Sequence, residues 1–452
     1  MASPDVSSLL EVADRIVGRA RADEEVEVVV VAEQGTEVRV YEGEVESLSA
    51  ADTAGVGVRV LDGGRQGLAW AGTLDPTAVD ALLDEARDNL RFASADPHAG
   101  LATPDGVPPV ELHLLDPGVA ALPTADKVAL AIEVEAATRR ADPRISGIES
   151  AEYADSVSAA AVVSTTGVRA TSAESVCWLS VYPLAGEGDA TQTGFGFSLA
   201  RRPADLDPAA AAADAARRAT RMLGAVRPTT GRTTLVLDPW VTAQVLEVVG
   251  STLSGEAVVR GRSPFADRLG ETIASPMITL VDDPTNPDAF SATASDGEGL
   301  ATRRNVLIDG GVLQMFVHNA TSARRAGTVS TGSAVRGSYR SAPGAGCAAL
   351  ALAPGTATQA QLVEQVGDGI LIADVAGLHS GVNPVSGDVS VGAEGLAIRG
   401  GAVAEPLREF TIATTLQRLL TDVDAVGADL EWLPMGAAGV SLVVRDVMVS
   451  GQ

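Results

Sequence analysis

The chain has 452 residues, of which 46% are hydrophobic and 20% charged, and these figures predict a soluble, folded protein of two or three domains. A formal net charge of −26 disfavours a nucleic-acid partner, because binding to phosphates requires clustered Lys and Arg. No apolar stretch of the sequence approaches the roughly 20 residues of a membrane helix, and the start lacks a signal-peptide pattern, so we expect a cytoplasmic protein without membrane contact.

The first part of the chain predicts a small α+β unit. A helix is expected from Pro4 to about Arg21, with Ser3 as its N-cap, because its apolar residues recur with helical spacing. Asp62-Gly63-Gly64 is typical of a hairpin turn, and Asp75-Pro76 combines a cap with a first-turn proline and predicts a second helix. Strands are expected at Val26–Ala32, Thr36–Tyr41, Gly55–Leu61 and Gly67–Ala71.

A loose stretch rich in Pro, Gly and Asp, residues 92–123, leads to a second unit with the same plan. A helix is expected over Thr124–Arg140. Asp207-Pro208 predicts the start of another helix, and Gly224 predicts its end. The strands between these helices are expected within Ser146–Tyr153, Ala159–Ser164, Val168–Tyr182 and Thr191–Ala200.

Beyond Arg227 the pattern becomes mostly strands, which favours a barrel or a sandwich. The predicted fold class is therefore α+β: two small α+β units, each an antiparallel sheet with helices, followed by a large β-rich C-terminal barrel or sandwich domain. We expect the domains to span residues 1–110, 120–226 and 228–452. The few helices expected in the last domain are Val241–Leu253, Asn319–Ala326 and Thr356–Val366.

The cysteines and the acidic strings are expected to be structural. Cys177 and Cys347 lie far apart and show no metal-ligand spacing, so we expect buried, reduced thiols. Asp282-Asp283 and the string that begins at Asp296-Gly-Glu-Gly place several carboxylates near one another. Their spacing matches no calcium-binding loop, so turn formation on a hairpin is the expected role.

Three strings in the last domain are distinctive: Arg262–Glu271, Asp296–Arg303 and the compositionally unusual His379–Asp388. Together with the stretch that begins at Thr234, they resemble the TldD/PmbA family, and the likeness covers essentially the whole chain. The resemblance implies a relation to a zinc peptidase that trims peptide precursors and degrades unfolded small proteins. It also implies paired chains, of which one carries the metal.

The zinc-binding pattern of that family is altered in this chain. The catalytic member of the family carries His-Glu-x-x-x-His on a helix, with a cysteine near the C-terminus as a further ligand. On that pattern the two histidines correspond to Leu246 and Ser251, the glutamate corresponds to Glu247, and no cysteine follows Cys347. Leucine offers no donor to zinc, and a serine hydroxyl is a poor one. The resemblance therefore implies a PmbA (TldE)-type chain that binds no cofactor itself, with zinc in its partner.

Glu247 is a weak candidate for a remnant general base, since a peptidase glutamate acts on a water molecule that a metal polarises. His379 and Ser380 suggest a base beside a nucleophile, but adjacent residues of a strand point to opposite faces. A loop that contacts substrate or partner is the favoured interpretation of this string, through the polar residues His379, Ser380, Asn383, Ser386 and Asp388.

The leading hypothesis is a TldE/PmbA-like subunit of a TldD/TldE-type zinc metallopeptidase complex that acts on unfolded peptides or small precursor proteins. Such a chain would serve in partner assembly and in holding the substrate, with β-strand addition as one mode of peptide binding. Its partner would be a TldD-like catalytic chain in a heterodimer, or a second copy in a homodimer. The alternative is a stand-alone homo-oligomeric binding protein without a peptidase role. A third possibility is an independent hydrolase that uses Ser380 or Glu247.

Overall fold

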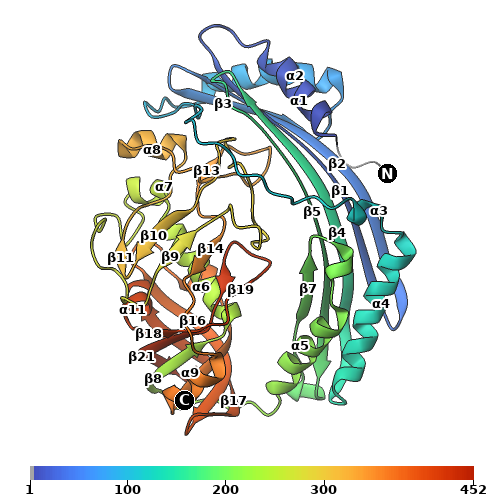
Figure 1. The fold of residues 1–452 in the computed structure, drawn as a ribbon, viewed down its shortest axis with the longest axis vertical. Helices are drawn as coiled ribbons and strands as arrows, with labels where there is room; N and C mark the ends of the chain where they lie inside the picture. The colour runs from blue at the N-terminus through green and yellow to red at the C-terminus, as the bar shows by residue number, and fades with distance from the viewer. Residues whose placement is uncertain (1–4, 452) are drawn as a thin grey trace. The chain divides into compact units, whose positions relative to one another are not determined.

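The computed structural model describes residues 5–451, which divide into two compact units. Unit 1 holds the chain up to Thr103, His113–Gly224 and the short segment Gly337–Ala342. Unit 2 holds Pro104–Leu112, Ala225–Arg336 and the chain from Pro343. Each unit therefore incorporates a short segment from the part of the sequence that otherwise builds the other unit. Figure 1 follows the chain by colour through both.

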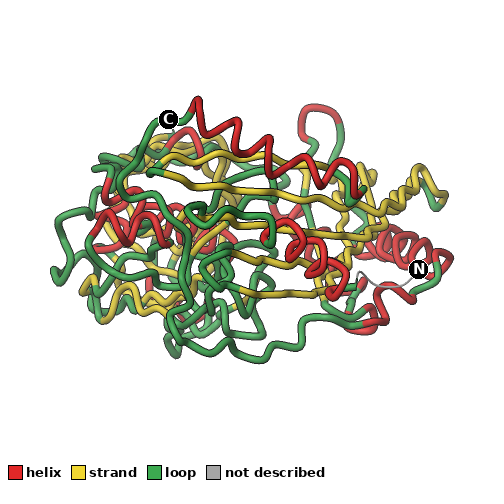
Figure 2. The backbone as a smooth tube through the Cα atoms, turned by 90° about the horizontal axis from the view of Figure 1, so that it is seen from above, coloured by secondary structure: helices red, strands yellow, loops and turns green. Residues whose placement is uncertain are grey.

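Unit 1 is built on one antiparallel sheet, with the strand order β3-β2-β1-β4-β5-β6 and with β7 paired to β5. The two α+β units expected from the sequence share this sheet, because β1 and β4 pair along their length from Glu27↔Ser164 to Val40↔Ala151. The long strands are yellow in Figure 2. Their bounds are Glu25–Tyr41 (β1), Glu44–Asp62 (β2), Arg65–Ala71 (β3), Ile145–Ser164 (β4), Arg169–Ala185 (β5), Gln192–Thr193 (β6) and Gly196–Ala200 (β7).

Two predictions for the strands are corrected by this sheet. The stretches expected as separate strands on either side of Gly35 form the single strand β1, because Gly35 pairs with strands on both sides, with Ala51 of β2 and with Ser156 of β4. Likewise, the two stretches expected at Ser146–Tyr153 and Ala159–Ser164 form the single strand β4. The glycine hairpin turn is confirmed, with Gly63 and Gly64 at φ of 56° and 75° between β2 and β3.

The helices of unit 1 begin where local capping chemistry favours a start. The carboxylate of Asp75 accepts hydrogen bonds from the backbone N–H of Thr77 and Ala78, and that of Asp207 caps α5, as predicted. The first helix begins at Val6 with Asp5 as its N-cap, and the predicted Ser3 and Pro4 lie outside the described residues. The helices are Val6–Val17 (α1), Pro76–Asn89 (α2), Pro117–Ala121 (α3), Thr124–Ala141 (α4) and Pro208–Arg221 (α5), with short 3₁₀ turns at Leu90–Phe92, Gly188–Ala190 and Pro203–Asp205.

The long strands contribute to two hydrophobic cores on the same face of the sheet. In β1, Val26, Val28 and Val30 pack under α1 and α2, while Val38 and Val40 pack under α4 and α5. These residues are all an even number of positions apart, so their side chains point to one face. The four longer helices of the unit therefore cover one face of the sheet, as Figure 1 shows for α4 and α5.

Part of β2 forms an unpaired edge of this sheet. Among the described residues, β3 pairs with β2 only from Val56 to Asp62, so the stretch Glu44–Gly55 has β1 on one side and no strand on the other. Residues 44–53 are all exposed, and they include Val45 and Leu48, each 46% exposed. A long open edge leaves backbone N–H and C=O groups available for pairing with another extended chain.

Tyr339 packs against the face of β2 that lies opposite the helices. A Cβ atom on Gly55 would lie 2.2 Å from the Tyr339 ring, and one on Gly57 would lie 1.9 Å from the Tyr339 carbonyl oxygen, so both positions require glycine. The guanidinium of Arg340 lies 4.5 Å from the centre of the Trp70 ring in β3, which adds a cation–π contact. These contacts hold the segment Gly337–Ala342 in unit 1.

Unit 2 contains a small closed barrel, which confirms the predicted β-rich C-terminal architecture. Its strand order is β17-β16-β15-β8-β21, and pairing of β17 with β21 closes the ring, for example at Ala413↔Met448. The pair β8 and β15 is parallel, and the other pairs of the ring are antiparallel. The strands are Gly231–Leu237 (β8), Gly369–Ala376 (β15), Asp388–Arg399 (β16), Ala402–Thr415 (β17) and Leu442–Ser450 (β21), and Val423–Val426 (β18) pairs with β21.

The rest of unit 2 consists of short strands, short helices and long loops. The strands β9, β10, β11 and β14 form a second sheet, at Leu280–Asp282, Asn305–Asp309, Val312–Leu313 and Leu350–Leu352. Two further pairs join Ala334–Val335 (β12) with Gly344–Ala345 (β13), and Glu431–Trp432 (β19) with Ala438–Gly439 (β20). The helices are Pro239–Thr252 (α6), Gly255–Val259 (α7), Ala320–Ala326 (α8), Gln359–Val366 (α9), Leu378–Gly381 (α10) and Leu416–Thr421 (α11).

Candidate functional site

The helix α6 carries Leu246 and Ser251, the positions that correspond to the two histidines of the His-Glu-x-x-x-His pattern. It begins at Pro239, and the carboxylate of Asp238 accepts a hydrogen bond of 3.2 Å from the Trp240 N–H. Because α6 combines Val and Leu with few charged residues, it packs on more than one side. Val241, Val245 and Val248 follow one another at helical spacing and face the end of the barrel.

The side chains at the two degenerate positions, Leu246 and Ser251, and at the retained glutamate, Glu247, do not converge on a common point. Leu246 is 2% exposed and belongs to the core, whereas Glu247 and Ser251 are exposed. The Ser251 Oγ donates to the Val248 carbonyl oxygen at 2.7 Å, and the Glu247 Oε1 accepts from the Gly436 N–H at 2.8 Å. Glu247 therefore anchors the loop before β20. A buried hydrocarbon, a carboxylate bonded to the backbone and a hydroxyl on the surface do not fit a zinc ion.

The side of α6 that carries Gly250 packs against Cys347. A Cβ atom on Gly250 would lie 2.5 Å from Leu350 Cδ1 and 3.5 Å from the Cys347 Sγ, so the helix requires glycine there to approach β14. Cys347 is half-buried and Cys177 is fully buried, so the expectation of two buried thiols holds fully only for Cys177. Burial raises the pKa of Cys177 to about 12 and also raises that of Cys347.

A buried carboxyl group next to Cys347 was not anticipated from the sequence. The Asp282 Oδ1 accepts hydrogen bonds from the N–H groups of Ala348 and Ala349, at 2.9 and 2.8 Å. Within residues 5–451 no group hydrogen-bonds to its Oδ2, and burial raises the pKa of Asp282 to about 6. The sequence predicted a turn here, but the pairing of β9 with β14 encloses the side chain.

The acidic string at Asp296 forms the predicted turn. The Asp296 Oδ1 accepts from the N–H groups of Glu298 and Leu300, and its Oδ2 accepts from the Ala334 N–H at 3.0 Å. Burial raises the pKa of this carboxyl to about 6 as well. Across the part of the chain that the structure describes, no three His, Cys, Asp or Glu side chains are grouped so that they could hold a metal ion.

The polar loop predicted to contact substrate or partner connects β15 to β16. It starts at Gly377, whose φ of 81° is favoured by glycine, and passes through α10. The Ser380 Oγ donates to the Gly377 carbonyl oxygen at 3.3 Å, so this hydroxyl caps the turn instead of pairing with His379. The predicted contact residues are all exposed: His379, Ser380, Asn383 and Ser386 lie on the loop, and Asp388 begins β16.

Asn383 organises the second half of the loop. Its Oδ1 accepts from the N–H groups of Val385 and Ser386, at 3.0 and 3.3 Å, and its own N–H donates to the Asp388 carbonyl oxygen at 2.9 Å. The Ser386 Oγ donates to the Asp388 Oδ2 at 2.7 Å. These local bonds place the polar side chains of the loop together on the surface, next to the open end of the barrel.

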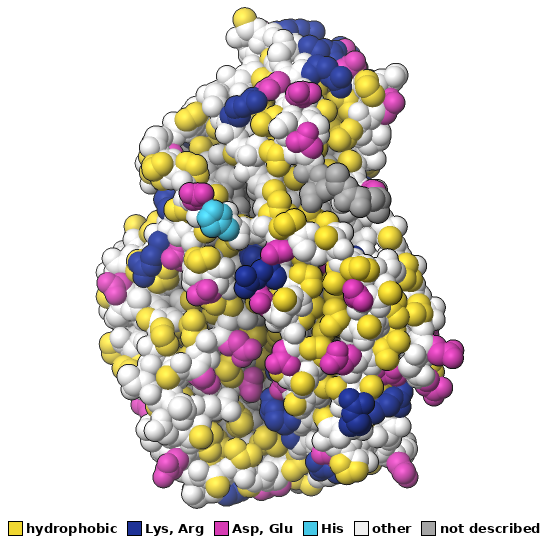
Figure 3. Space-filling view, turned by 45° about the vertical axis from the view of Figure 1, so that its right-hand side comes forward, with side chains coloured by type: hydrophobic (Ala, Val, Ile, Leu, Met, Phe, Trp, Pro, Cys, Tyr) yellow, Lys and Arg dark blue, Asp and Glu magenta, His cyan; other side chains and the backbone are white. Residues whose placement is uncertain are grey.

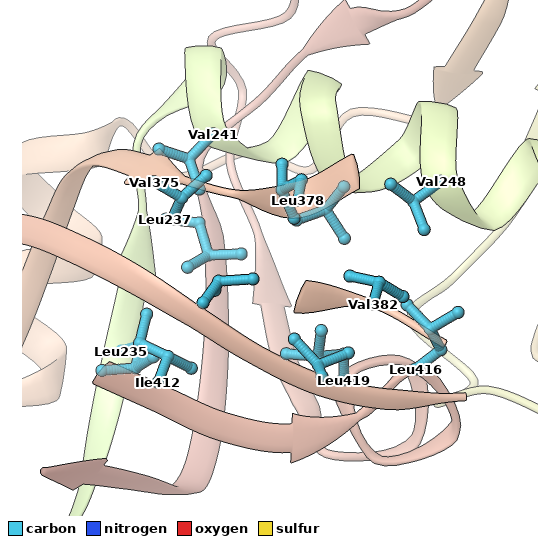
Figure 4. Close-up of a pocket in the computed structure, with 13 residues that line it drawn as sticks. Leu235, Leu237, Val241, Val248, Val375, Leu378, Val382, Ile412, Leu416 and Leu419 are labelled. Carbon is cyan, nitrogen blue, oxygen red and sulfur yellow. The ribbon is translucent and has the colours of Figure 1, made fainter. Parts of the chain in front are cut away.

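A pocket at this end of the barrel was missed by the sequence reasoning. Thirteen residues line it, all of them Leu, Val or Ile, and the space that it bounds is about 430 Å³ with open solvent included. Val241 and Val248 reach into it from α6, and Leu378 and Val382 reach into it from α10 and the residue after it (Figure 4). The alternation of valines in β16 was the available sign, since Val389 and Val391 point into the barrel.

On the face that Figure 3 shows, acidic and basic side chains are interspersed and do not form a large patch of one charge. Ion pairs on the surface include Arg39 with Glu46 at 2.8 Å and Arg268 with Glu271 at 2.7 Å. Within the described residues, no helix is both long enough and apolar enough to cross a membrane.

Comparisons with known proteins agree with this architecture. Three domain models of the PmbA/TldA metallopeptidases match the chain in order, at residues 26–90, 117–223 and 230–451. The chain is 26% identical to "Metalloprotease PmbA" of Escherichia coli O157:H7 over 429 residues, which cover 94% of this chain and 92% of the relative. It is 25% identical to "Metalloprotease TldD homolog" of Haemophilus influenzae over 424 residues, which cover 88% and 86%.

A solved structure, that of TldE from Thermococcus kodakarensis, has the same fold, with a TM-score of 0.88 and 23% identity, covering 98% of this chain and 99% of the other. The three domain matches span most of the sequence and run in the same order as the structural elements. The chain is a member of the PmbA/TldD metallopeptidase family.

Proposed function

We propose that this chain is the TldE/PmbA-type subunit of a cytoplasmic TldD/TldE-like peptidase complex. In this complex a TldD-like partner supplies the zinc chemistry, and this chain contributes to assembly and to holding an unfolded peptide. The observation that carries the proposal is the chemistry of α6, where Leu246 is buried and Glu247 is bonded to the backbone of Gly436. Neither arrangement supports a metal-polarised water molecule.

The open edge of β2 supports the peptide-holding part of the proposal. An extended peptide that pairs with residues 44–55 would bond through its backbone, and such pairing tolerates varied side chains. The acidic side chains Glu44, Glu46 and Asp52 lie on this strand and favour neutral or basic peptides. Unfolded substrates of varied sequence need this kind of recognition.

The experiment is to purify the chain alone and together with a TldD-like protein, and to measure mass by light scattering, zinc content and peptide cleavage. We expect zinc and cleavage only when the partner is present. Glu247→Gln in this chain should leave cleavage by the complex unchanged, while the same change in the partner's His-Glu motif should abolish it. Stoichiometric zinc and proteolysis by this chain alone would overturn the proposal. A homodimer that ignores the partner would instead support a stand-alone binding protein.

The open edge can be tested in the same assay. Leu48→Lys places a charge on the unpaired strand and should raise KM for unfolded peptides several-fold with little change in kcat, because binding of the peptide is weakened and the chemistry is not. Val403→Lys is the matched control, since Val403 is 48% exposed on β17 in unit 2. An equal effect of both substitutions would remove the edge of β2 from the proposal.

A further inference from the structure

The pocket at the end of the barrel has the properties of a binding site for hydrocarbon. Its inner wall comes from the barrel strands, where Leu235 is 0% exposed and Ile412 is 4% exposed. Its mouth lies between α6 and α10, and the mouth residues Val245, Val248, Leu378 and Val382 are only partly buried. The wall is therefore fixed by the barrel, while the rim is accessible from outside.

The lining determines what chemistry can enter. Every lining side chain is aliphatic, so a polar group placed inside would lose its hydrogen bonds to water and find no replacement from these side chains. An apolar group gains from leaving water, by an amount that increases with its buried surface. The volume of about 430 Å³ includes open solvent, so only part of it is available to a ligand.

The rim argues for a peptide side chain over a free fatty acid. The exposed carboxylate of Asp388 lies at the start of β16, which borders the mouth, and the whole chain carries a net charge of −26, so an anionic headgroup would be repelled. On the neighbouring loop the Asn383 Oδ1 and the Ser386 Oγ already bond within the loop, so the side-chain NH₂ of Asn383 is the group that can donate to a peptide carbonyl. Val385 on this loop is 50% exposed and adds an apolar side chain to its surface.

We propose that this pocket binds one aliphatic side chain, of the leucine or valine type, from an extended polypeptide that lies along the loop between β15 and β16. The ligand is a polypeptide only if the proposed function holds. The pocket would then give this subunit a preference for apolar residues at one position of the substrate. This role is separate from the backbone pairing at the edge of β2, which does not select side chains.

The test uses the isolated chain with ¹³C-labelled Leu and Val methyl groups, so that it needs neither partner nor zinc and can fail independently of the proposed function. The probes are acetyl-Gly-Gly-X-Gly-Gly-amide peptides in which X is Leu, Val or Asn, together with decanoate. We expect the Leu peptide to shift the methyl signals of Val248, Leu378 and Val382. Its Kd should be about fourfold lower than that of the Val peptide, from about 0.8 kcal/mol for one methylene.

Variants that fill the mouth complete the test. Val248→Phe and, independently, Val245→Phe should weaken binding of the Leu peptide tenfold or more, whereas Val329→Phe, at a site 77% exposed, should not change it. The proposal is overturned if the Asn peptide binds as tightly as the Leu peptide, or if no peptide shifts these signals. It is equally overturned if decanoate binds there and the Leu peptide does not, or if both Phe variants fold and bind like the unmodified chain.

Discussion

The buried carboxyl of Asp282 predicts an unusual pH dependence of stability. Its pKa is raised from 3.8 to about 6 in the folded protein, so the folded state binds a proton more tightly than the unfolded state does. Stability from this group is therefore greatest at low pH, and it falls as pH rises from about 4 through about 6. The shift of about two pKa units lowers the free energy of unfolding at neutral pH by roughly 3 kcal/mol relative to its value at low pH. About 2 kcal/mol of this loss falls between pH values of about 4.5 and 7.5.

Asp282→Asn removes the ionisation and keeps an oxygen that can accept from the N–H groups of Ala348 and Ala349. The free energy of unfolding of this variant, relative to that of the unmodified chain, should rise by about 2 kcal/mol on going from about pH 4.5 to about pH 7.5. Urea unfolding followed by circular dichroism at both pH values measures this difference. The contribution of Asp296, which has a similar pKa, cancels because both proteins contain it.

Asp288→Asn is the matched control, because Asp288 is exposed a few residues further along the chain. It should leave the pH dependence of the unfolding free energy unchanged. The reasoning is refuted if Asp282→Asn and the unmodified chain show the same dependence on pH. It is refuted more strongly if the variant becomes relatively less stable at the higher pH, since that sign would mean that the folded state favours the charged carboxylate.

Two further predictions concern unit 1. Gly55→Ala places a Cβ atom 2.2 Å from the ring of Tyr339, so it should displace the segment Gly337–Ala342 and make that segment a site of rapid limited proteolysis. Gly231→Ala is the control, because its Cβ meets no atom within 4 Å and should not change the proteolysis. The carboxylate of Asp155 is 6% exposed and lies 2.5 Å from the Lys127 Nζ. Lys127→Met removes this buried cation, so it should lower the free energy of unfolding by about 3–5 kcal/mol. The double variant with Asp155→Asn should recover most of this loss in urea titrations, and a double variant as unstable as the single one would contradict a role for the charge.

Local signals in the sequence predicted the helix starts and the tight turns well. Asp75-Pro76 and Asp207-Pro208 begin helices because a carboxylate can accept the free N–H groups of the first turn whatever surrounds it. The same holds for Asn319, whose side chain caps α8 in a capping box. Strand lengths were less predictable, because Gly35 stays in β1 only through pairing with strands on both sides.

The candidate site was predictable in part. The polar residues of His379–Asp388 and their position on a turn-rich loop follow from the abundance of Gly, Asn and Pro there. That Ser251 is exposed depends on which side of α6 meets the core, and the sequence alone did not resolve it. The domain limits near residues 110–120 and 227 stay a prediction.

The sequence by itself determined the helix caps, the hairpin turns, the α+β class and the lack of metal donors at positions 246 and 251, because each depends on the chemistry of residues that are close together in the chain. Only the tertiary structure decided that β1 and β4 join two α+β patterns into one sheet, that Asp282 loses contact with water, and that valines from α6 and β16 enclose a pocket. These features arise from contacts between segments tens to hundreds of residues apart, and the burial that they produce cannot be derived from local pattern.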